Sequence, residues 1–361
     1  MEVHPLPILS DLPEPDLYKK TRTYYRNGTT RTLAWRKQQI LNIREMLIKH
    51  ESEFIEALKT DLNKPRFESY SADIGGVHMC INQCMKNLEN WTKEVKIERQ
   101  DIFTLGCPTT VKFSPYGVAF VIGTWNYPIN LTLTPVVLAI AAGNAVICKP
   151  SEVTPACSAV LTKLGNQYLS ELGGVVFAEG GREFVQSLMN EHRLDFVFYT
   201  GGSVGGKAVA KLCAEKLIPS VLELGGKNPV LVDDLDCQEI SVNDVARRIL
   251  WSKVFNSGQI CLAADYVIFK SEKDRDTIIQ EMKKIMATEW YPTGLTSNEP
   301  DYCHLVNEHH FDHVDGFVKK LAKDETFIRI ADCEPDRENL FYSGINTILK
   351  RMKQHISILL D

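Results

Sequence analysis

The chain has 361 residues, a length that accommodates two domains, and its 44% hydrophobic and 24% charged residues are typical of an ordinary globular protein. A formal charge of −5 gives no basis for expecting nucleic acid as a partner, and no apolar run reaches the roughly 18 residues of a membrane span. Residues 1–15 lack the basic start and apolar core of a signal peptide. The ten cysteines form no disulfide framework, so we expect a reducing, cytoplasmic location.

The N-terminal part of the chain predicts helices. Apolar residues recur at helical spacing from Leu33 to Leu47, and Phe54 and Leu58 continue the same stripe. Residues 70–93 predict a further helix, although the pair Gly75-Gly76 weakens its start.

Short apolar runs alternate with helical stretches after about residue 111. We expect strands over 117–123, 144–148, 175–178, 195–199 and 220–224, and helices over 131–142, 155–169, 183–190 and 204–216. Strands without polar alternation, separated by helices, indicate a parallel sheet covered on both faces. The pattern therefore predicts an α/β fold with a doubly wound, Rossmann-like parallel sheet.

A second α/β unit is expected after the hinge Gly225-Gly226. Its predicted elements are a strand over 229–232, a helix over 242–255, a strand over 266–269 and a helix over 274–286. Residues 327–361 show no clear continuation of this pattern. We predict N-terminal helices plus a dinucleotide-binding domain in 1–225, a partial catalytic domain in 226–325, and an unassigned segment in 326–361.

Cys261 is the first candidate for chemistry. It follows a predicted helix and sits beside glycine and small residues that let another molecule approach closely. A thiolate attacks a carbonyl carbon well, but the thiol needs an electropositive setting to ionise. The alternative, a small buried hydrophobic residue, stays open on this cysteine alone.

Two further side chains could support such a nucleophile. Asn126 follows directly on a buried parallel strand, where ligands bind and where an amide could donate to an oxyanion. It could equally be a turn asparagine before proline. Glu223 is a carboxylate in an otherwise apolar strand, and its burial would raise its pKa toward that of a general base. A structural ion pair is the alternative for Glu223.

The turn from Gly201 to Lys207 lies between a predicted strand and a helix. Its spacing mimics a phosphate-binding loop, but Ala208 replaces the hydroxyl that would hold magnesium, which argues against a nucleotide triphosphatase. Backbone N–H groups here could face a phosphate, or the segment could be a plain glycine turn. Lys149 and Glu152 close the second strand and could bind ribose hydroxyls, or form an exposed ion pair. A carboxylate in that place favours NAD over NADP.

Metal binding is not expected. His309, His310 and His313 form a cluster on a predicted helix, but no carboxylate or cysteine pattern completes a site.

Five of these segments together resemble the aldehyde dehydrogenase superfamily, in the family's order. They are 124–128 (Thr-Trp-Asn-Tyr-Pro), 149–152 (Lys-Pro-Ser-Glu), 198–203 (Phe-Tyr-Thr-Gly-Gly-Ser), 223–227 (Glu-Leu-Gly-Gly-Lys) and 258–261 (Gly-Gln-Ile-Cys). The resemblance covers about residues 15 to 320. Asn-Tyr-Pro and the run Leu-Gly-Gly-Lys-Asn-Pro are similar to the class 3 branch, which acts on fatty and aromatic aldehydes.

The resemblance implies a role for each site residue. Cys261 attacks the aldehyde, Asn126 and the backbone N–H of Cys261 hold the oxyanion, and Glu223 activates the water that hydrolyses the thioester. The implied cofactor is NAD, with NADP as the alternative. Residues expected to bind it are Trp125, Lys149, Glu152, Gly201, Gly202, Ser203, Val204, Gly205 and Gly206. The branch also implies a homodimer, with residues 107–112 in its assembly arm, and a medium-chain, long-chain or aromatic aldehyde as substrate.

The sequence departs from the family beyond the segment that matches 304–314. The family continues with a Glu-Ile-Phe-Gly-Pro motif and further strands, which we do not find here. We therefore expect an incomplete catalytic domain. A nucleotide-binding pseudoenzyme, and thiol-dependent ester hydrolysis without cofactor, stay open beside an active dehydrogenase.

Overall fold

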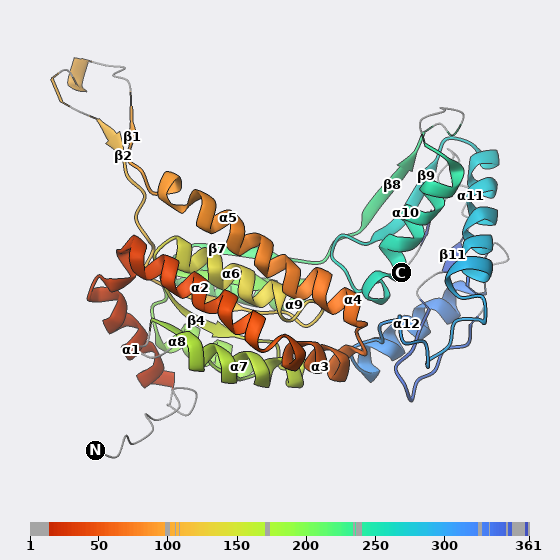
Figure 1. The fold of residues 1–361 in the computed structure, drawn as a ribbon, viewed down its shortest axis with the longest axis horizontal. Helices are drawn as coiled ribbons and strands as arrows, with labels where there is room; N and C mark the ends of the chain where they lie inside the picture. Colours follow the sequence, from red (N-terminus) through yellow and green to blue (C-terminus); the bar gives the residue numbers. More distant parts are fainter. Residues whose placement is uncertain are drawn as a thin grey trace. The chain divides into compact units, whose positions relative to one another are not determined.

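The computed structural model describes residues 14–97, 102–104, 106–107, 109–169, 174–233, 235, 240–323, 327–331, 333–343, 346–348 and 358–359. The chain divides into two compact units (Figure 1). The first contains residues 1–57 and 70–223, and the second contains 58–69 and 224–361. Residues 58–69, which the sequence grouped with the N-terminal domain, thus belong to the second unit. Among the described residues, none of the helices combines the length and the apolar character that crossing a lipid bilayer requires.

The first unit is built on a five-stranded parallel sheet. Its strands are β3 (Val118–Ile122), β4 (Ala145–Lys149), β5 (Val175–Phe177), β6 (Phe196–Thr200) and β7 (Ser220–Glu223). Their order is β5-β4-β3-β6-β7, and every neighbouring pair is parallel. The order runs outward from β3 in both directions, so a topological switch point lies between β3 and β6. The predicted doubly wound sheet is confirmed.

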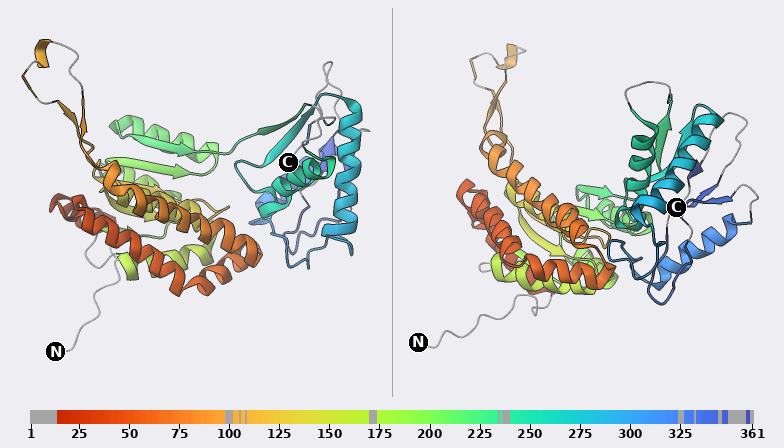
Figure 2. Two further views of the ribbon diagram at one scale, coloured as in Figure 1. Left: turned by 45° about the horizontal axis from the view of Figure 1, so that its top comes forward. Right: turned by 45° about the vertical axis from the view of Figure 1, so that its right-hand side comes forward.

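Helices cover both faces of this sheet (Figure 2). The connecting helices are α6 (Asn130–Ala141), α7 (Pro155–Leu169), α8 (Arg182–Glu191) and α9 (Ser203–Lys216). The helices α2 (Leu33–Lys49) and α5 (Gly75–Trp91) pack over α6, and α2 also packs on α7. The opposite face carries α1 (Glu14–Arg26), α8 and α9, which contribute Leu17, Leu188 and Val209 to the core of this unit. The N-terminal region also contains η2 (Thr29–Arg31) and α3 (Glu51–Leu62).

The pair Gly75-Gly76 begins a helix instead of interrupting one. A π-helical turn, η3 (Ser69–Ile74), leads directly into α5. A Cβ on Gly75 would lie 3.0 Å from the carbonyl oxygen of Tyr70, and a Cβ on Gly76 would clash with the side chain of Asn130 at the start of α6. The two glycines therefore permit close packing within the first unit.

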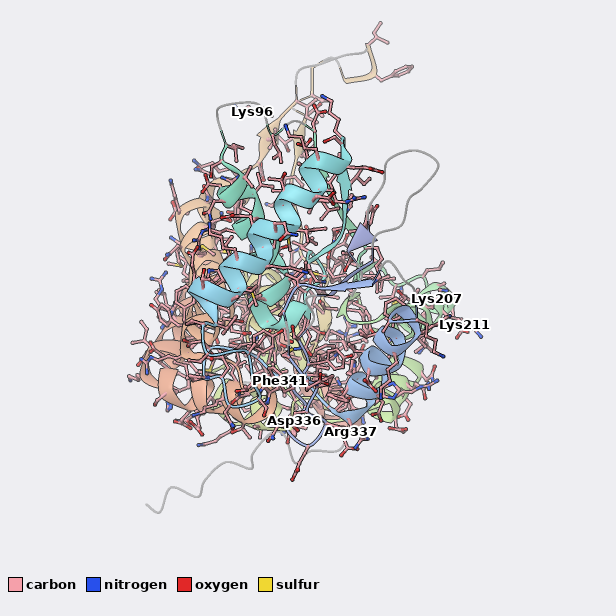
Figure 3. All side chains as sticks on the ribbon, turned by 90° about the vertical axis from the view of Figure 1, so that its right-hand side faces the viewer. Lys96, Lys207, Lys211, Asp336, Arg337 and Phe341 are labelled. Atoms are coloured by element: carbon pink, nitrogen blue, oxygen red, sulfur yellow. The ribbon has the colours of Figure 1, made fainter. Side chains whose placement is uncertain are left out.

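A short antiparallel hairpin follows α5. It pairs β1 (Val95–Lys96) with β2 (Thr110–Val111), which lies within the predicted 107–112 strand, and η4 (Ile102–Thr104) lies between them. Lys96 of this hairpin is labelled in Figure 3. Val95 and Val111, which face each other across the pair, are 53% and 38% exposed. The hairpin thus presents apolar side chains to solvent.

The second unit contains a parallel pair, β8 (Asn228–Val232) and β9 (Ala264–Phe269). Its helical segments are α4 (Arg66–Glu68), α10 (Val242–Val254), η5 (Phe255–Gly258), α11 (Glu272–Ile285), η6 (Met286–Trp290) and α12 (Glu308–Leu321). A three-stranded antiparallel sheet joins β10 (Phe327–Arg329), β11 (Asn346–Ile348) and β12 (Ile358–Leu359).

Part of the segment left unassigned by the sequence packs into this second core. Phe341, labelled in Figure 3, is fully buried there. Its ring packs edge-on against that of Tyr302, another fully buried aromatic residue. Asp336 and Arg337, labelled in the same view, lie on the turn that precedes it. The described residues 336–343 are therefore a structural part of the second unit.

Candidate active site

A pocket of about 360 Å³ opens at the carboxyl ends of β3, β4 and β6 in the first unit. This is the switch point of the sheet, the place where doubly wound folds bind ligands. The lining side chains relevant here are Thr124 and Trp125 after β3, Lys149, Ser151 and Glu152 after β4, Arg182 and Gln186 of α8, and Tyr199, Gly201, Gly202, Val204 and Gly205 around the start of α9.

Lys149 is the most enclosed charged group of this pocket. Its side chain is only 3% exposed, its ammonium pairs with the Glu152 carboxylate, and it donates to the backbone carbonyl of Gly180 at 3.1 Å. Glu152 is half exposed and stands at the pocket rim. A buried lysine needs such partners because an isolated charge is costly to desolvate. The pair offers both donors and an acceptor to a bound polyol.

The glycine turn after β6 leaves room for one aromatic side chain. The hydroxyl of Tyr199 donates to the carbonyl of Gly202 at 3.1 Å, and a Cβ on Gly201 or Gly205 would clash with this hydroxyl. Burial, with a smaller contribution from the Glu152 carboxylate, raises the pKa of Tyr199. The backbone at the start of α9 is consequently open to the pocket.

Most of the predicted cofactor-binding residues line this one pocket. Trp125, Lys149, Glu152, Gly201, Gly202, Val204 and Gly205 do so, whereas Ser203 and Gly206 lie in the same helical turn outside the lining. The sequence missed Arg182 and Tyr199. Arg182 begins α8 after the third strand, and no motif marks it. Tyr199 lies within the matched 198–203 segment and could have been found as the bulky residue beside two glycines.

Asn126 follows directly on the pocket residue Trp125 and is half buried. Its loop is fixed at both ends. The buried carboxylate of Asp73 accepts from the backbone N–H groups of Ile129 and Asn130 at 3.1 and 3.2 Å, which caps α6. A Cβ on Gly123 would clash with Thr132 of α6, so the strand-to-helix turn is tight. The fold thereby holds Asn126 at the carboxyl end of β3.

Glu223 ends β7, and its backbone carbonyl accepts from the N–H of Gly201 at 3.0 Å. The side chain, however, is exposed, so the burial that the sequence argument for a general base invoked is not found at Glu223. The physical reason is the position of β7 at the edge of the five-stranded sheet, where Ser220 and Val221 are exposed as well. Apolar neighbours in sequence do not bury a residue on an edge strand.

Cys261 lies in the second unit, in a turn between η5 and β9, and is exposed. Its backbone carbonyl accepts from the side-chain amide of Asn228 at 2.8 Å. The same amide donates to the carbonyl of Ala263 at 3.1 Å, and the N–H of Asn228 donates to the buried Asp265 at 3.1 Å. The cysteine thus presents its thiol on a turn whose backbone is held in place, and it is no buried core residue.

The histidine cluster lies on α12, as the sequence predicted for a helix. His310 Nδ1 lies 2.8 Å from the side-chain oxygen of Asn307, which caps the helix. Within the described part of the chain, no group of three or more His, Cys, Asp or Glu side chains could hold a metal ion.

The sheet order and the switch-point pocket define a doubly wound, nucleotide-binding type of α/β protein. Comparison with known proteins specifies it further. The model of the aldehyde dehydrogenase family matches residues 17–359. The chain is 34% identical over 303 residues to aldehyde dehydrogenase family 3 member B1 of Rattus norvegicus, covering 84% of this chain and 63% of that protein. It is 35% identical over 305 residues to the dimeric NADP-preferring aldehyde dehydrogenase of Canis lupus familiaris, covering 84% and 65%.

Solved structures agree. The substrate-bound AldH of Staphylococcus aureus superposes with a TM-score of 0.83 at 29% identity, covering 92% of this chain and 70% of that chain. The chain therefore belongs to the aldehyde dehydrogenase family. Family 3 members A2 and H1 are also among its relatives, at 36% identity each, which confirms the resemblance to the class 3 branch. The chain spans a little under two thirds of the length of the curated relatives it matches, such as 63% of the rat protein.

Proposed function

We propose that this chain oxidises an aldehyde to a carboxylic acid with NAD or NADP. The observation that carries the proposal is an exposed cysteine, Cys261, on a turn held by side-chain hydrogen bonds, in a chain that belongs to the aldehyde dehydrogenase family. A structural cysteine would be buried, as Cys148 and Cys303 are. The match to the family model as far as residue 359 does not favour the pseudoenzyme alternative.

The chemistry follows from the residue types. The Cys261 thiolate forms a bond to the aldehyde carbon, and the side-chain amide of Asn126 with the backbone N–H of Cys261 stabilises the resulting oxyanion. When bound, the cofactor accepts the hydride that leaves this carbon. The product on Cys261 is a thioester. Glu223 then takes a proton from a water molecule, whose oxygen adds to the thioester carbon, and the acid leaves as the thiolate is released. The exposure of Glu223 gives water direct access to this carboxylate.

The residues present fit a dinucleotide. The pocket lies where such a cofactor binds in this fold, and nothing lies within 4 Å of a Cβ at Gly202, so a ligand can approach the backbone there. Lys149 and Glu152 would hold ribose hydroxyls, and the backbone at Gly201 and Gly202 would lie near the pyrophosphate. Relatives include an enzyme named NADP-preferring, so both cofactors belong in the test.

The substrate proposed is a medium-chain, long-chain or aromatic aldehyde, because the class 3 relatives are the most similar proteins reported above. The partner proposed is a second copy of the chain, which would cover the apolar residues of the β1–β2 hairpin. The cytoplasmic location expected from the cysteines is part of the same proposal.

The direct experiment measures the formation of NADH from NAD and of NADPH from NADP by the purified chain with an aliphatic and an aromatic aldehyde. We expect Cys261→Ala to abolish it and Cys107→Ala, at another exposed cysteine, to leave it unchanged. An equal rate with Cys261→Ala would reject the mechanism. Binding of NAD without turnover by wild type would replace it with the pseudoenzyme, and release of nitrophenol from an activated ester without NAD would indicate the simpler thiol esterase.

A further inference from the structure

The backbone that leads to Cys261 is unusual. Asn256, Ser257 and Gly258 have φ values of 53°, 52° and 73°, so three consecutive residues occupy the left-handed region. Only the last of the three is glycine, and residues with a side chain rarely adopt this backbone conformation. Such a conformation persists only where the surroundings impose it.

One surrounding group comes from a distant part of the sequence. The carboxylate of Glu68, in α4, accepts from the backbone N–H of Asn256 at 2.7 Å. The thiol of Cys303 donates to the same Glu68 oxygen at 3.6 Å and lies 3.5 Å from the side-chain oxygen of Asn256. Glu68 is 6% exposed, and Asn256 and Cys303 are fully buried. A carboxylate is a strong acceptor for a backbone N–H in such a setting.

Further hydrogen bonds connect Asn256 to the rest of the loop. The side-chain amide of Asn256 donates to the backbone carbonyl of Gln259 at 3.1 Å. In return, the side-chain amide of Gln259 donates to the backbone carbonyl of Asn256 at 3.1 Å. Gln259 also donates to the carbonyl of His304 at 3.0 Å and accepts from the N–H of Val306 at 3.2 Å. The chain is therefore held from Asn256 to Gln259, two residues before Cys261.

We propose that Glu68 is a positioning residue for Cys261. Its carboxylate holds Asn256 in the left-handed conformation, and through Gln259 this sets the place of the thiol. The proposal rests on the proposed role of Cys261 as the nucleophile. Glu68 contacts neither substrate nor cofactor in this account and acts only through the loop. A purely structural Glu68 would change the stability of the second unit without changing the reactivity of a folded Cys261.

The test compares three substitutions that separate reach from charge. Glu68→Gln keeps an oxygen at the same distance, Glu68→Asp keeps the charge but is one methylene shorter, and Glu68→Ala keeps neither. We expect the kcat of Glu68→Gln to be close to that of wild type. The kcat of Glu68→Asp and of Glu68→Ala should fall about 10- to 100-fold, the loss typical of a nucleophile displaced by about 1 Å. The Kd for NAD, measured by calorimetry, should not change, because Glu68 is not among the residues that line the pocket.

A second readout needs no turnover. The rate of alkylation of Cys261 by iodoacetamide is followed by the mass of its peptide, with Cys107 in the same sample as an internal reference. The alkylation rate of Cys261 should differ from wild type in Glu68→Asp and Glu68→Ala, and it should equal wild type in Glu68→Gln. The alkylation rate of Cys107 should be the same in all of these proteins. Glu338→Ala, an exposed glutamate of the second unit, is the matched control and should equal wild type in both assays.

The proposal would be overturned if a folded Glu68→Asp variant kept the wild-type kcat and the wild-type alkylation rate of Cys261. It would also be overturned if Glu68→Gln lost as much kcat as Glu68→Asp. If Glu68→Ala does not fold, by circular dichroism, the Asp and Gln variants decide. If wild type itself has no dehydrogenase activity, the proposed function fails, but the alkylation rates still test the positioning of the thiol.

Discussion

The backbone oxygen of Cys261 lies 2.8 Å from the position that a Cβ on Gly226 would occupy. The two segments meet backbone to backbone, and the amide of Asn228 joins them through its hydrogen bond to the same oxygen. The segment that enters β8 and the turn that carries the thiol are thus packed without space for a side chain. Gly226 is required here for close approach, since its own φ is not in the left-handed region.

Gly226→Ala should therefore displace the Cys261 turn. We expect a loss of about 1–3 kcal/mol in the free energy of unfolding, as for other overpacked sites, and a lower kcat. Gly225→Ala is the matched control, because nothing lies within 4 Å of a Cβ at Gly225, and it should stay within about 0.5 kcal/mol of wild type. Urea unfolding and steady-state rates measure both, and equal behaviour of the two variants would contradict the packing argument.

Glu152→Gln should shift cofactor choice toward NADP. The carboxylate of Glu152 lies at the pocket rim and forms an ion pair with the ammonium of Lys149. Its replacement by an amide removes a negative charge and leaves the Lys149 ammonium available to a phosphate. We expect the ratio of kcat/KM for NADP to that for NAD to rise on the order of tenfold, since like charges a few ångström apart near a surface repel by about 1 kcal/mol or more. Glu183→Gln, on α8 but outside the pocket lining, should leave the ratio unchanged.

His304 should make the second unit sensitive to mild acid. Burial lowers the pKa of its imidazole below the usual 6.5, and Asn63 donates to its Nε2 at 3.1 Å, which suits the neutral ring. The folded state therefore binds the proton less well than the unfolded state, so this contribution to stability is present above pH 6.5 and is lost as the pH falls below it. Urea unfolding from pH 8 to 5.5 should show a steeper loss for wild type than for His304→Gln. His313→Gln, at an exposed histidine of α12, should follow wild type, and parallel curves for all three proteins would reject this role.

The hairpin of β1 and β2 should mediate self-association. Val95→Lys combined with Val111→Glu removes exposed apolar surface while opposite charges keep the cross-strand pair favourable. Light scattering should give a dimer for wild type and a monomer for this double variant. Thr110→Glu, which places a charge opposite Lys96 without removing apolar surface, should leave the dimer intact. A monomeric wild type would reject the proposed partner.

The sheet of the first unit could be predicted because its strands are short apolar runs bounded by glycine or polar turns. Residues at the strand ends, such as Lys149 and Gly201, could be assigned to one edge because parallel strands bring their carboxyl ends together. The sequence alone suggests that Gly75-Gly76 weakens the helix, because the contact that requires Gly76, with Asn130, is distant in the sequence.

The remaining features depend on long-range contacts that no local pattern encodes. Glu223 is exposed because of where β7 lies in the sheet order, and periodicity does not give that order. The local sequence around Glu68 does not distinguish it from an ordinary surface glutamate, because its contact with Asn256 forms only in the folded chain. Phe341 lies in a stretch with few periodic apolar residues, yet it is fully buried in the core of the second unit.

The central claim is that Cys261 carries the acyl group during turnover, and trapping that group tests it most directly. In Glu223→Gln the hydrolytic step should be slowed, so that aldehyde with NAD gives a single burst of NADH followed by slow turnover. Mass spectrometry of the quenched protein should then show the acyl mass on the peptide that contains residue 261. An unmodified Cys261, or an acyl group on another residue, in a folded variant whose wild type turns over would contradict the account.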